Sequence, residues 1–297
     1  MAKCLVTGHR GYIGSHLYKK LKDLGHEVQG IDLFENHDIL HDLREYSDGS
    51  ERFHPHYSNF KPEYVFHLAC IPRVEYSVVH PVATMENNVL ATTYILNFAR
   101  KSGAKRVIYS GSSAVNGNGN GPTSPYGLHK LISEMECKLY SDLFGLDTVS
   151  LRYFNVYSED QPADGPYSTA IANWMKYIRE DKTPFITGDG TQSRDMTYVE
   201  DVVSANVFAM EQKENFHGQH YDVGTGENIT LNEISNIVRD YFPNLKFEYV
   251  APRPGDVNST CADMSKMKKL GWEPKTKIRD GINKCFKLLK EELDERR

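Results

Sequence analysis

The chain has 297 residues, of which 25% are charged, and its formal net charge at pH 7 is -5. This length suffices for one large or two small domains with a continuous hydrophobic core. The acidic balance leaves no basic surface for a polyanion, so we expect no nucleic acid among the partners.

The cysteines are scattered, with no C-x-x-C pair and no spacing typical of a zinc site or a disulfide framework. They indicate reduced thiols, so we expect no metal and a cytoplasmic location. The first residues, MAKCLVTG, lead directly into a strand pattern and lack the features of a signal peptide. No apolar run approaches the ~20 residues that cross a bilayer, so we expect no membrane partner.

The first half of the chain alternates short β-branched runs with amphipathic helical stretches, a pattern typical of βαβ units. The expected strands are Lys3–Thr7, Glu27–Asp32, Tyr64–Ala69, Arg106–Ser110 and Thr148–Tyr153. The expected crossover helices are Tyr12–Leu24, Pro81–Lys101 and Pro125–Phe144. This order predicts an α/β fold built on a Rossmann-type, doubly wound parallel sheet.

After about residue 155, proline and glycine become frequent, and a helix candidate at Ser168–Glu180 precedes the loop-like DKTPFITGDGTQSRD. We expect a second, smaller α/β domain for substrate here. Met196–Met210 and Gln219–Gly224 have the character of a return to the first domain. The predicted division is therefore 1–165 plus roughly 196–224 for the dinucleotide-binding domain, and roughly 166–195 plus 225–297 for the substrate domain.

The first strand ends in a glycine-rich turn, where Gly8, Gly11 and Gly14 form G-x-x-G-x-x-G and Tyr12 and Ile13 open the next helix. Glycines allow a tight turn, and they let backbone N–H groups and the positive end of the helix approach a pyrophosphate. A purely structural turn would use the same residues. The strand before it and the helix after it favour the dinucleotide site.

The second strand ends in Asp32, where a carboxylate would accept hydrogen bonds from the adenosine ribose hydroxyls and repel a 2′-phosphate. This position favours NAD over NADP. Two alternatives stay open: Asp32 as an ordinary strand-end residue, and Arg10, within the turn, as a partner for a phosphate.

Ser110 and Ser112 end the fourth strand, and Tyr126 and Lys130 lie one helical turn apart on the helix that follows. A Tyr/Lys pair at this spacing is often only a solvated helix face. The serines change that reading, because the carboxyl edge of the sheet is where such folds place their ligands. The intervening NGNGNGP, at 116–122, predicts a flexible loop, either a mobile surface loop or a substrate lid.

The predicted trio has a defined chemistry. A phenol titrates near ~10, but an adjacent ammonium and a positively charged nicotinamide favour its anion and make Tyr126 a usable base. Ser112 would hydrogen-bond the developing oxyanion. Lys130 would also orient the nicotinamide ribose.

With a series of motifs in order along the chain, the sequence resembles the extended short-chain dehydrogenase/reductase family, and within it the UDP-glucose 4-epimerase branch. These motifs are TGHRGYIG, Asp32, HLAC, ENN, SGSS, YGLHK, LRYFNVY, GDGTQSRDMTYVEDV and RPGD. The resemblance implies reversible C4 epimerisation of a UDP-hexose by transient oxidation with bound NAD. UDP-glucose and UDP-galactose are the expected substrates, with the N-acetyl forms as an extension.

By the same resemblance, further residues bind the cofactor. Asp42 and Leu43 would contact the adenine, and Ala69 would line the pyrophosphate and ribose channel. Asn88 and Tyr153 would help to hold NAD. Ser110, Tyr126 and Lys130 complete the expected cofactor set.

The expected substrate residues beyond Ser112 and Tyr126 lie in the second half. Asn155, Arg194, Arg253 and Asp256 match family positions that bind the nucleotide diphosphate and ribose. Each arginine alone could instead be a surface ion pair. Thr260, four residues after Asp256, matches a position where a small side chain leaves room for an N-acetyl group, unless it merely starts a strand.

Two positions depart from the family pattern: Thr187 stands where relatives often have a base-stacking aromatic, and Asn116 where they commonly have tyrosine. A 4,6-dehydratase, decarboxylase or reductase of the same family is the first rival function. A dehydratase would need an acid beside Ser112, where Ser113 and Ala114 stand.

A uronic acid substrate is disfavoured, because VYSEDQP after Asn155 contains acidic residues and no arginine. A non-catalytic NAD-binding protein is the second rival function, although such proteins commonly lose the Tyr or the Lys. The resemblance also implies a homodimer in which Pro81–Lys101 and Pro125–Phe144 pair with their symmetry mates. Val89, Ile95, Leu131 and Leu139 are the apolar positions expected to serve that interface, unless they serve only the internal core.

Overall fold

The computed structural model describes residues 1–33, 39–40, 43, 59–117, 119–163, 169–252 and 258–296. It divides into two compact units, each built from two stretches of chain. Unit 1 comprises Met1–Arg152 and Val203–Tyr221, and unit 2 comprises Tyr153–Val202 and Asp222–Arg297. The chain therefore changes unit after residues 152, 202 and 221, where the sequence placed the changes near 165, 195 and 224.

Unit 1 contains a seven-stranded sheet of order β11-β6-β5-β4-β1-β2-β3, and its α/β class is the predicted one. Its strands are β1 (Lys3–Thr7), β2 (Glu27–Asp32), β3 (Ile39–Leu40), β4 (Tyr64–His67), β5 (Arg106–Ser112), β6 (Asp147–Tyr153) and β11 (His220–Val223). β1 pairs in parallel with both β2 and β4, and β4 pairs in parallel with β5. The strand order thus reverses at β1, which is where doubly wound sheets bind ligands at the strands' carboxyl ends.

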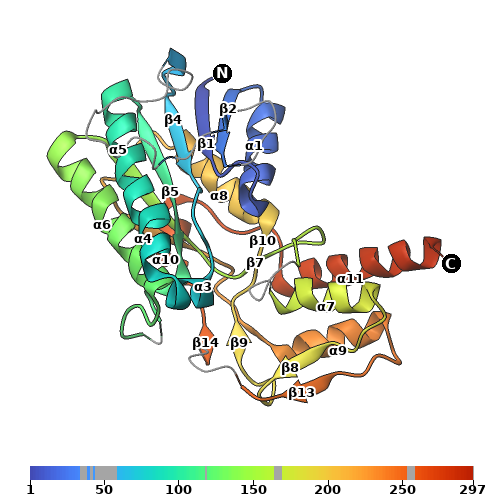
Figure 1. Ribbon diagram of the computed structural model, residues 1–297. Coiled ribbons are helices and arrows are strands. Elements are labelled where there is room, and N and C mark those ends of the chain that lie inside the picture. Colours follow the sequence, from blue (N-terminus) through green and yellow to red (C-terminus); the bar gives the residue numbers. More distant parts are fainter. Residues whose placement is uncertain are drawn as a thin grey trace. The chain divides into compact units, whose positions relative to one another are not determined.

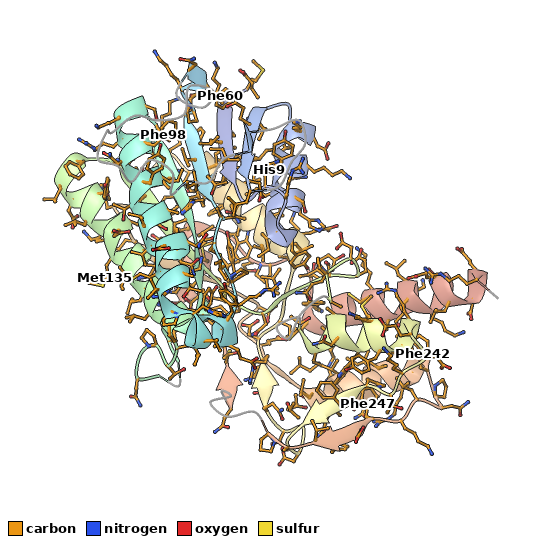
Figure 2. The ribbon with its side chains drawn as sticks, in the orientation of Figure 1. His9, Phe60, Phe98, Met135, Phe242 and Phe247 are labelled. Carbon is orange, nitrogen blue, oxygen red and sulfur yellow. The ribbon has the colours of Figure 1, made fainter. Side chains whose placement is uncertain are left out.

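Helices cover both faces of this sheet, with α5 and α6 on one side and α1 on the other (Figure 1). The helical elements are α1 (Tyr12–Asp23), α3 (Val74–Val79), α4 (Pro81–Met85), η1 (Glu86–Leu90), α5 (Ala91–Ser102), η2 (Ser113–Val115), α6 (Pro125–Phe144) and α8 (Val199–Glu211). Phe98 points from α5 toward the strands (Figure 2) and is 1% exposed. Its neighbours in the core come from β1, β4 and α6.

Local sequence explains where these helices start and stop. α6 begins after Ser124, whose Oγ accepts a hydrogen bond from the N–H of Gly127, with Pro125 in the first turn. α5 and α6 end at Gly103 and Gly145, both in the left-handed region that favours glycine. The single helix expected over Pro81–Lys101 is instead α4, a π-helical turn η1 and α5.

Unit 2 holds three small sheets and four helices within its described residues. The sheets are β7 (Val156–Tyr157) with β10 (Thr197–Tyr198); β8 (Phe185–Thr187) with β13 (Glu248–Val250); and β9 (Ser193–Arg194) between β12 (Ile229–Thr230) and β14 (Ser259–Thr260). The helices are α7 (Ala170–Arg179), α9 (Leu231–Tyr241), α10 (Ser265–Leu270) and α11 (Ile278–Glu295). α9 starts with a capping box of Thr230 and Glu233.

Unit 2 buries its own hydrophobic core. Trp174 of α7 and Phe286 of α11 lie within it, and Phe242 and Phe247 pack against it (Figure 2). The rings of Trp174 and Phe247 meet edge to face, with centroids 4.7 Å apart. Among the described residues of either unit, no helix is both long and apolar enough to cross a membrane.

Candidate active site

The glycine turn after β1 has the geometry that a dinucleotide requires. Gly8 has φ +70°, and a Cβ there would lie 2.7 Å from the backbone nitrogen of Ala69. A Cβ on Gly14 would lie 2.0 Å from the carbonyl oxygen of Gly8. α1 starts at Tyr12 and continues with Ile13, and no side chain caps its N-terminus, because the N-cap residue is Gly11. The first-turn N–H groups therefore fit a pyrophosphate.

Asp32 lies beside this turn at the end of β2. Its Oδ2 accepts a hydrogen bond of 2.9 Å from the backbone N–H of Arg10, and its Oδ1 accepts one of 2.8 Å from Leu33. The carboxylate is thus fixed next to the glycine turn, and its side chain is 11% exposed. This placement favours a ribose with free hydroxyls over one with a 2′-phosphate.

The loop after β4 is held from behind by Asn88 of η1. The Asn88 Oδ1 accepts a hydrogen bond of 2.7 Å from the N–H of Ile71, and its Nδ2 donates one of 3.1 Å to the carbonyl of Ile71. Asn88 is 1% exposed. Predicted to help to hold NAD, it acts here on the loop that carries Ala69, and π-helical turns of this kind are common at functional sites.

His67, which the sequence reading did not single out, forms a buried chain of hydrogen bonds under the same loop. Its Nδ1 lies 2.7 Å from the hydroxyl of Thr7, which accepts from the N–H of Ala69, and its Nε2 lies 3.0 Å from the hydroxyl of Thr92. Because Thr92 donates its own proton to the carbonyl of Asn88, the His67 Nε2 must be the donor toward Thr92. Burial lowers the pKa of His67 to about 3, with a further contribution from the Lys130 charge.

The predicted catalytic group lies at the carboxyl end of β5 and the first turns of α6. Lys130 donates a hydrogen bond of 2.7 Å to the carbonyl of Ser110, and its Nζ lies 4.9 Å from the ring centre of Tyr109 and 5.9 Å from that of Tyr126. The side chain of Ser112 lies close enough to that of Tyr126 to lower the pKa of its phenol. Ser110, Ser112, Tyr126 and Lys130 are therefore brought together as the sequence predicts.

The pKa of Tyr126 is raised by the protein alone, whereas the sequence predicts that an adjacent ammonium and a nicotinamide favour its phenolate. Burial raises the pKa of Tyr126, while the Lys130 charge and the Ser112 side chain lower it by less. Burial by itself lowers the pKa of Lys130, but Cys70, Tyr109 and Tyr126 together hold it well above its usual value. The protein's own residues keep Lys130 charged, and a positively charged nicotinamide would supply the rest of the shift toward a phenolate.

The remaining expected cofactor residues have mixed placements. Tyr153, 8% exposed, ends β6. Leu43 is buried in the core of unit 1, where its side chain packs against apolar neighbours. Asp42 lies outside the described residues, as do the expected substrate residues Arg253 and Asp256.

Three of the expected substrate residues lie together in unit 2. The Nδ2 of Asn155 donates hydrogen bonds of 2.7 Å to the carbonyl of Asp195 and 3.3 Å to the hydroxyl of Thr260. Thr260 pairs with Arg194 across β14 and β9. Asn155 itself has φ 33°, a left-handed backbone that places its side chain in this cluster. Thr260 therefore starts a strand and also touches a predicted substrate residue.

Asp195, also not singled out in the sequence reading, organises this cluster. Its carboxylate accepts hydrogen bonds of 2.8 Å and 2.7 Å from the N–H and hydroxyl of Thr225, 2.9 Å from Gly226 and 3.1 Å from Ala262. Burial nevertheless raises its pKa. A carboxylate directly after Arg194 in the SRD motif was the signal available in the sequence.

Thr187, the departure from the family pattern, is engaged within its own segment. Its carbonyl and hydroxyl oxygens accept hydrogen bonds of 2.7 Å and 3.0 Å from the side-chain amide of Gln192. It is half-buried. This position therefore offers a short polar side chain where an aromatic would offer a stacking face.

A doubly wound sheet with a dinucleotide turn and a Ser/Tyr/Lys group at its carboxyl edge defines a short-chain dehydrogenase/reductase that uses NAD. The sequence model of the NAD dependent epimerase/dehydratase family matches residues 4–224, and the chain belongs to this family. Its class is thereby an NAD-dependent enzyme that modifies sugar nucleotides.

Individual relatives match nearly the whole chain. A putative UDP-glucose 4-epimerase of Methanocaldococcus jannaschii is 33% identical over 304 residues, which cover 96% of this chain and 98% of the relative. The UDP-glucose 4-epimerase of Thermotoga maritima, solved with UDP-glucose, has a TM-score of 0.87 at 30% identity and covers 98% of this chain and 99% of its own. The UDP-N-acetylglucosamine 4-epimerase of Methanobrevibacter ruminantium M1, solved with UDP-N-acetylmuramic acid, has a TM-score of 0.87 at 29% identity, with 98% and 99% covered.

Proposed function

We propose that this protein catalyses the reversible C4 epimerisation of a UDP-hexose while NAD stays bound. The observation that carries the proposal is the group of buried Tyr126 and Lys130 with half-buried Ser112, in the same unit as the glycine turn. The names of the three relatives described above, one putative and two solved UDP-sugar 4-epimerases, support it.

In this reaction, Tyr126 takes the proton of the sugar's 4-hydroxyl as the hydride leaves the same carbon. NAD, which the glycine turn and Asp32 would hold, would supply the acceptor for that hydride and the donor for its return to the opposite face of the 4-keto sugar. Ser112 donates a hydrogen bond to the oxygen on which charge develops, and Tyr126 returns its proton in the second half of the cycle. Lys130 stays protonated and stabilises the phenolate, so no net oxidation or reduction occurs.

The substrate range depends on the cluster of Asn155, Arg194 and Thr260. Thr260 is small and contacts Asn155, so we propose that N-acetylated UDP-hexoses are accepted as well as plain ones. The name of the Methanobrevibacter relative supports this extension. In the Thr260→Tyr variant, the added ring should reject the N-acetyl substrate and spare the smaller one. Equal loss of both activities would contradict this role of Thr260.

Rival reactions fit less well. A dehydratase needs an acid next to Ser112, and the half-buried Ser113 and Ala114 fill those places. A uronic acid would meet carboxylates after Asn155. Of these, Glu159 is held by Tyr198 at 2.6 Å and by Lys284 at 3.2 Å. These contacts engage Glu159 within the protein and provide no positive group for the carboxylate of a uronic acid substrate. The Ser/Tyr/Lys group argues against the second rival, a non-catalytic NAD-binding protein.

We also propose a homodimer through the helical face of unit 1. Large apolar side chains are exposed on α3, α4, η1 and α6: Val78, Val79, Val82, Met85, Leu90, Leu128, Met135, Leu139, Leu143 and Phe144. Val89 and Ile95, which the sequence also suggested for the interface, are 8% and 0% exposed and belong to the core. A second copy of the chain is the simplest partner for such a face. The free cysteines separately suggest a reduced, cytoplasmic environment.

The decisive experiment is conversion of UDP-galactose to UDP-glucose by purified protein with no added reductant. We expect an equilibrium mixture of both sugars and no accumulation of NADH. Net formation of a dehydrated or decarboxylated sugar would contradict epimerisation in favour of the first rival. Failure with every UDP-hexose pair would contradict the proposal as a whole.

A further inference from the structure

Arg152, at the end of β6, forms a forked ion pair with Glu134 of α6. The Arg152 Nε lies 3.0 Å and 3.1 Å from the two carboxylate oxygens of Glu134, and Nη2 lies 2.7 Å from Oε2. The two side chains are 12% and 6% exposed. Such a fork fixes the relative orientation of both groups as well as neutralising them.

Glu134 belongs to the catalytic face of α6. It follows Tyr126 by eight residues and Lys130 by four, so the three side chains project from one side of the helix. Its carboxylate also packs on the end of β5, because a Cβ on Gly111 would lie 2.8 Å from the Glu134 Oε1. Gly111 separates Ser110, which binds Lys130, from Ser112.

The third arm of the guanidinium reaches the segment after Ser112. The Arg152 Nη1 donates a hydrogen bond of 3.3 Å to the Oδ1 of Asn116, the residue that ends η2. Arg152 is thus joined to α6 through Glu134 and to the serine segment through Asn116. One side chain bridges the two elements that supply the catalytic group.

We propose that Arg152 is a positioning residue, which holds the segment carrying Ser112 against the helix carrying Tyr126 and Lys130. The inference deepens the proposed function, because it assigns a role within the same catalytic group. Without the bridge, the Ser112 segment keeps its strand hydrogen bonds and the bond from Lys130 to Ser110, but loses the link from Asn116 to α6. The interaction between the side chains of Ser112 and Tyr126 then weakens, and displacements of this kind lower turnover more than binding.

Two variants test the bridge. Arg152→Lys keeps the positive charge, but a single ammonium cannot reproduce the fork and reach Asn116 as well. Asn116→Leu removes only the third arm and leaves every charge in place. We expect kcat to fall about 10- to 100-fold in Arg152→Lys and less in Asn116→Leu. KM for UDP-galactose and the occupancy by NAD should stay near the wild-type values in both.

Unit 1 provides a matched control in a second buried arginine pair. Arg106 lies 2.5 Å from Asp147 and also donates to the carbonyl of Ala209, and the paired side chains are 5% and 4% exposed. Arg106 opens β5, six residues before Ser112, which is about 20 Å along the strand. Arg106→Lys should lower thermal stability as Arg152→Lys does, with kcat of the folded protein unchanged. Equal losses of kcat in both variants would overturn the proposal.

A second readout needs no sugar and does not depend on epimerase activity. The phenolate absorbance of Tyr126 is titrated in the NAD-bound protein, as the difference between each protein and its Tyr126→Phe counterpart. Because the interaction with the Ser112 side chain favours the phenolate, its weakening should raise the pKa of Tyr126 in Arg152→Lys and leave it unchanged in Arg106→Lys. An unchanged pKa in Arg152→Lys would contradict the positioning role. A wild type that converts no UDP-hexose would instead contradict the proposed function.

Discussion

At the scale of single residues, Tyr126 has the most clearly defined role. Its ring is 9% exposed and packs beside Lys130, and only its hydroxyl takes part in the proposed proton transfer. Tyr126→Phe should therefore keep the fold and the bound NAD but lower kcat by about 10²- to 10⁴-fold. A coupled assay for UDP-glucose formation measures the loss. Near wild-type turnover would show that another group is the base.

His67 gives the protein a specific acid sensitivity. Its pKa is about 3 when folded and near 6.5 when unfolded, so between these values the unfolded chain binds a proton that the folded chain does not. The free energy of unfolding should therefore decrease as pH falls below about 6.5, by up to about 1.4 kcal/mol per pH unit from this group.

The measurement is denaturant unfolding of wild type and His67→Gln at several pH values. Subtracting the two curves cancels the carboxylates and the other histidines, among them His129, whose pKa burial also lowers. The difference should slope between pH 6.5 and 3 and be flat above pH 7.5. A flat difference throughout would mean that the pKa of His67 is the same in the folded and the unfolded protein.

The sequence could predict the catalytic residues but not those that hold them. Ser112, Tyr126 and Lys130 follow from spacing and from their place after a strand. Spacing alone did not reveal the roles of Arg152 and Asp195, because these depend on partners 18 to 67 residues away that only the fold brings near. Local patterns reveal groups that do chemistry, whereas support groups are defined by contacts across the fold.

At the scale of elements, the sequence predicted strands more reliably than it predicted their ends. β1 and β2 have the expected bounds, but β4 ends at His67 and not at Ala69, since the chain leaves the sheet to pass the glycine turn. The π-helical turn η1 was also missed, because an extra residue within a turn leaves the apolar periodicity on both sides intact.

That turn makes a test at the scale of elements. Asn88→Ala removes both hydrogen bonds to Ile71 and leaves its backbone groups without partners, at a cost of about 1–3 kcal/mol. The loop carrying Ala69 should loosen, so we expect weaker NAD binding together with the lower stability. Asn87→Ala is the control, since Asn87 bonds only within its own helix, to the carbonyl of Ala83. NAD affinity is measured by fluorescence titration. Equal affinities in the two variants would contradict the prediction that Asn88 of η1 supports NAD binding through the loop that carries Ala69.

At the scale of the whole molecule, the interleaved connection of the two units follows from the sheet. β11 must return beside β6 to complete the seven-stranded order, so the chain crosses from unit 2 back to unit 1 before it. The strand-like and helix-like character of residues 196–224 made this return predictable. The exposed apolar face on the helices of unit 1 was harder to predict from the sequence, because apolar residues that pack in the core alternate with exposed ones on the same helices.

α6 separates these two roles most clearly. Its buried residues include Tyr126, Lys130 and Cys137, whereas Met135 and Leu139 are 64% and 51% exposed, and Met135 lies on the outer side of the helix (Figure 2). If this face binds a second copy, each substitution occurs twice across the two-fold axis, so one charge per chain places two like charges in an apolar interface.

Met135→Glu should therefore convert a dimer into a monomer, which light scattering at micromolar concentration measures. Its thermal stability should fall only by the amount that binding of the second copy contributes. Lys138→Glu is the control, because Lys138 lies on the same helix, is half exposed and forms an ion pair with Asp142 on the surface. It should leave the mass unchanged. A wild type that is already monomeric would contradict the dimer, and the apolar face of α6 would then need another partner.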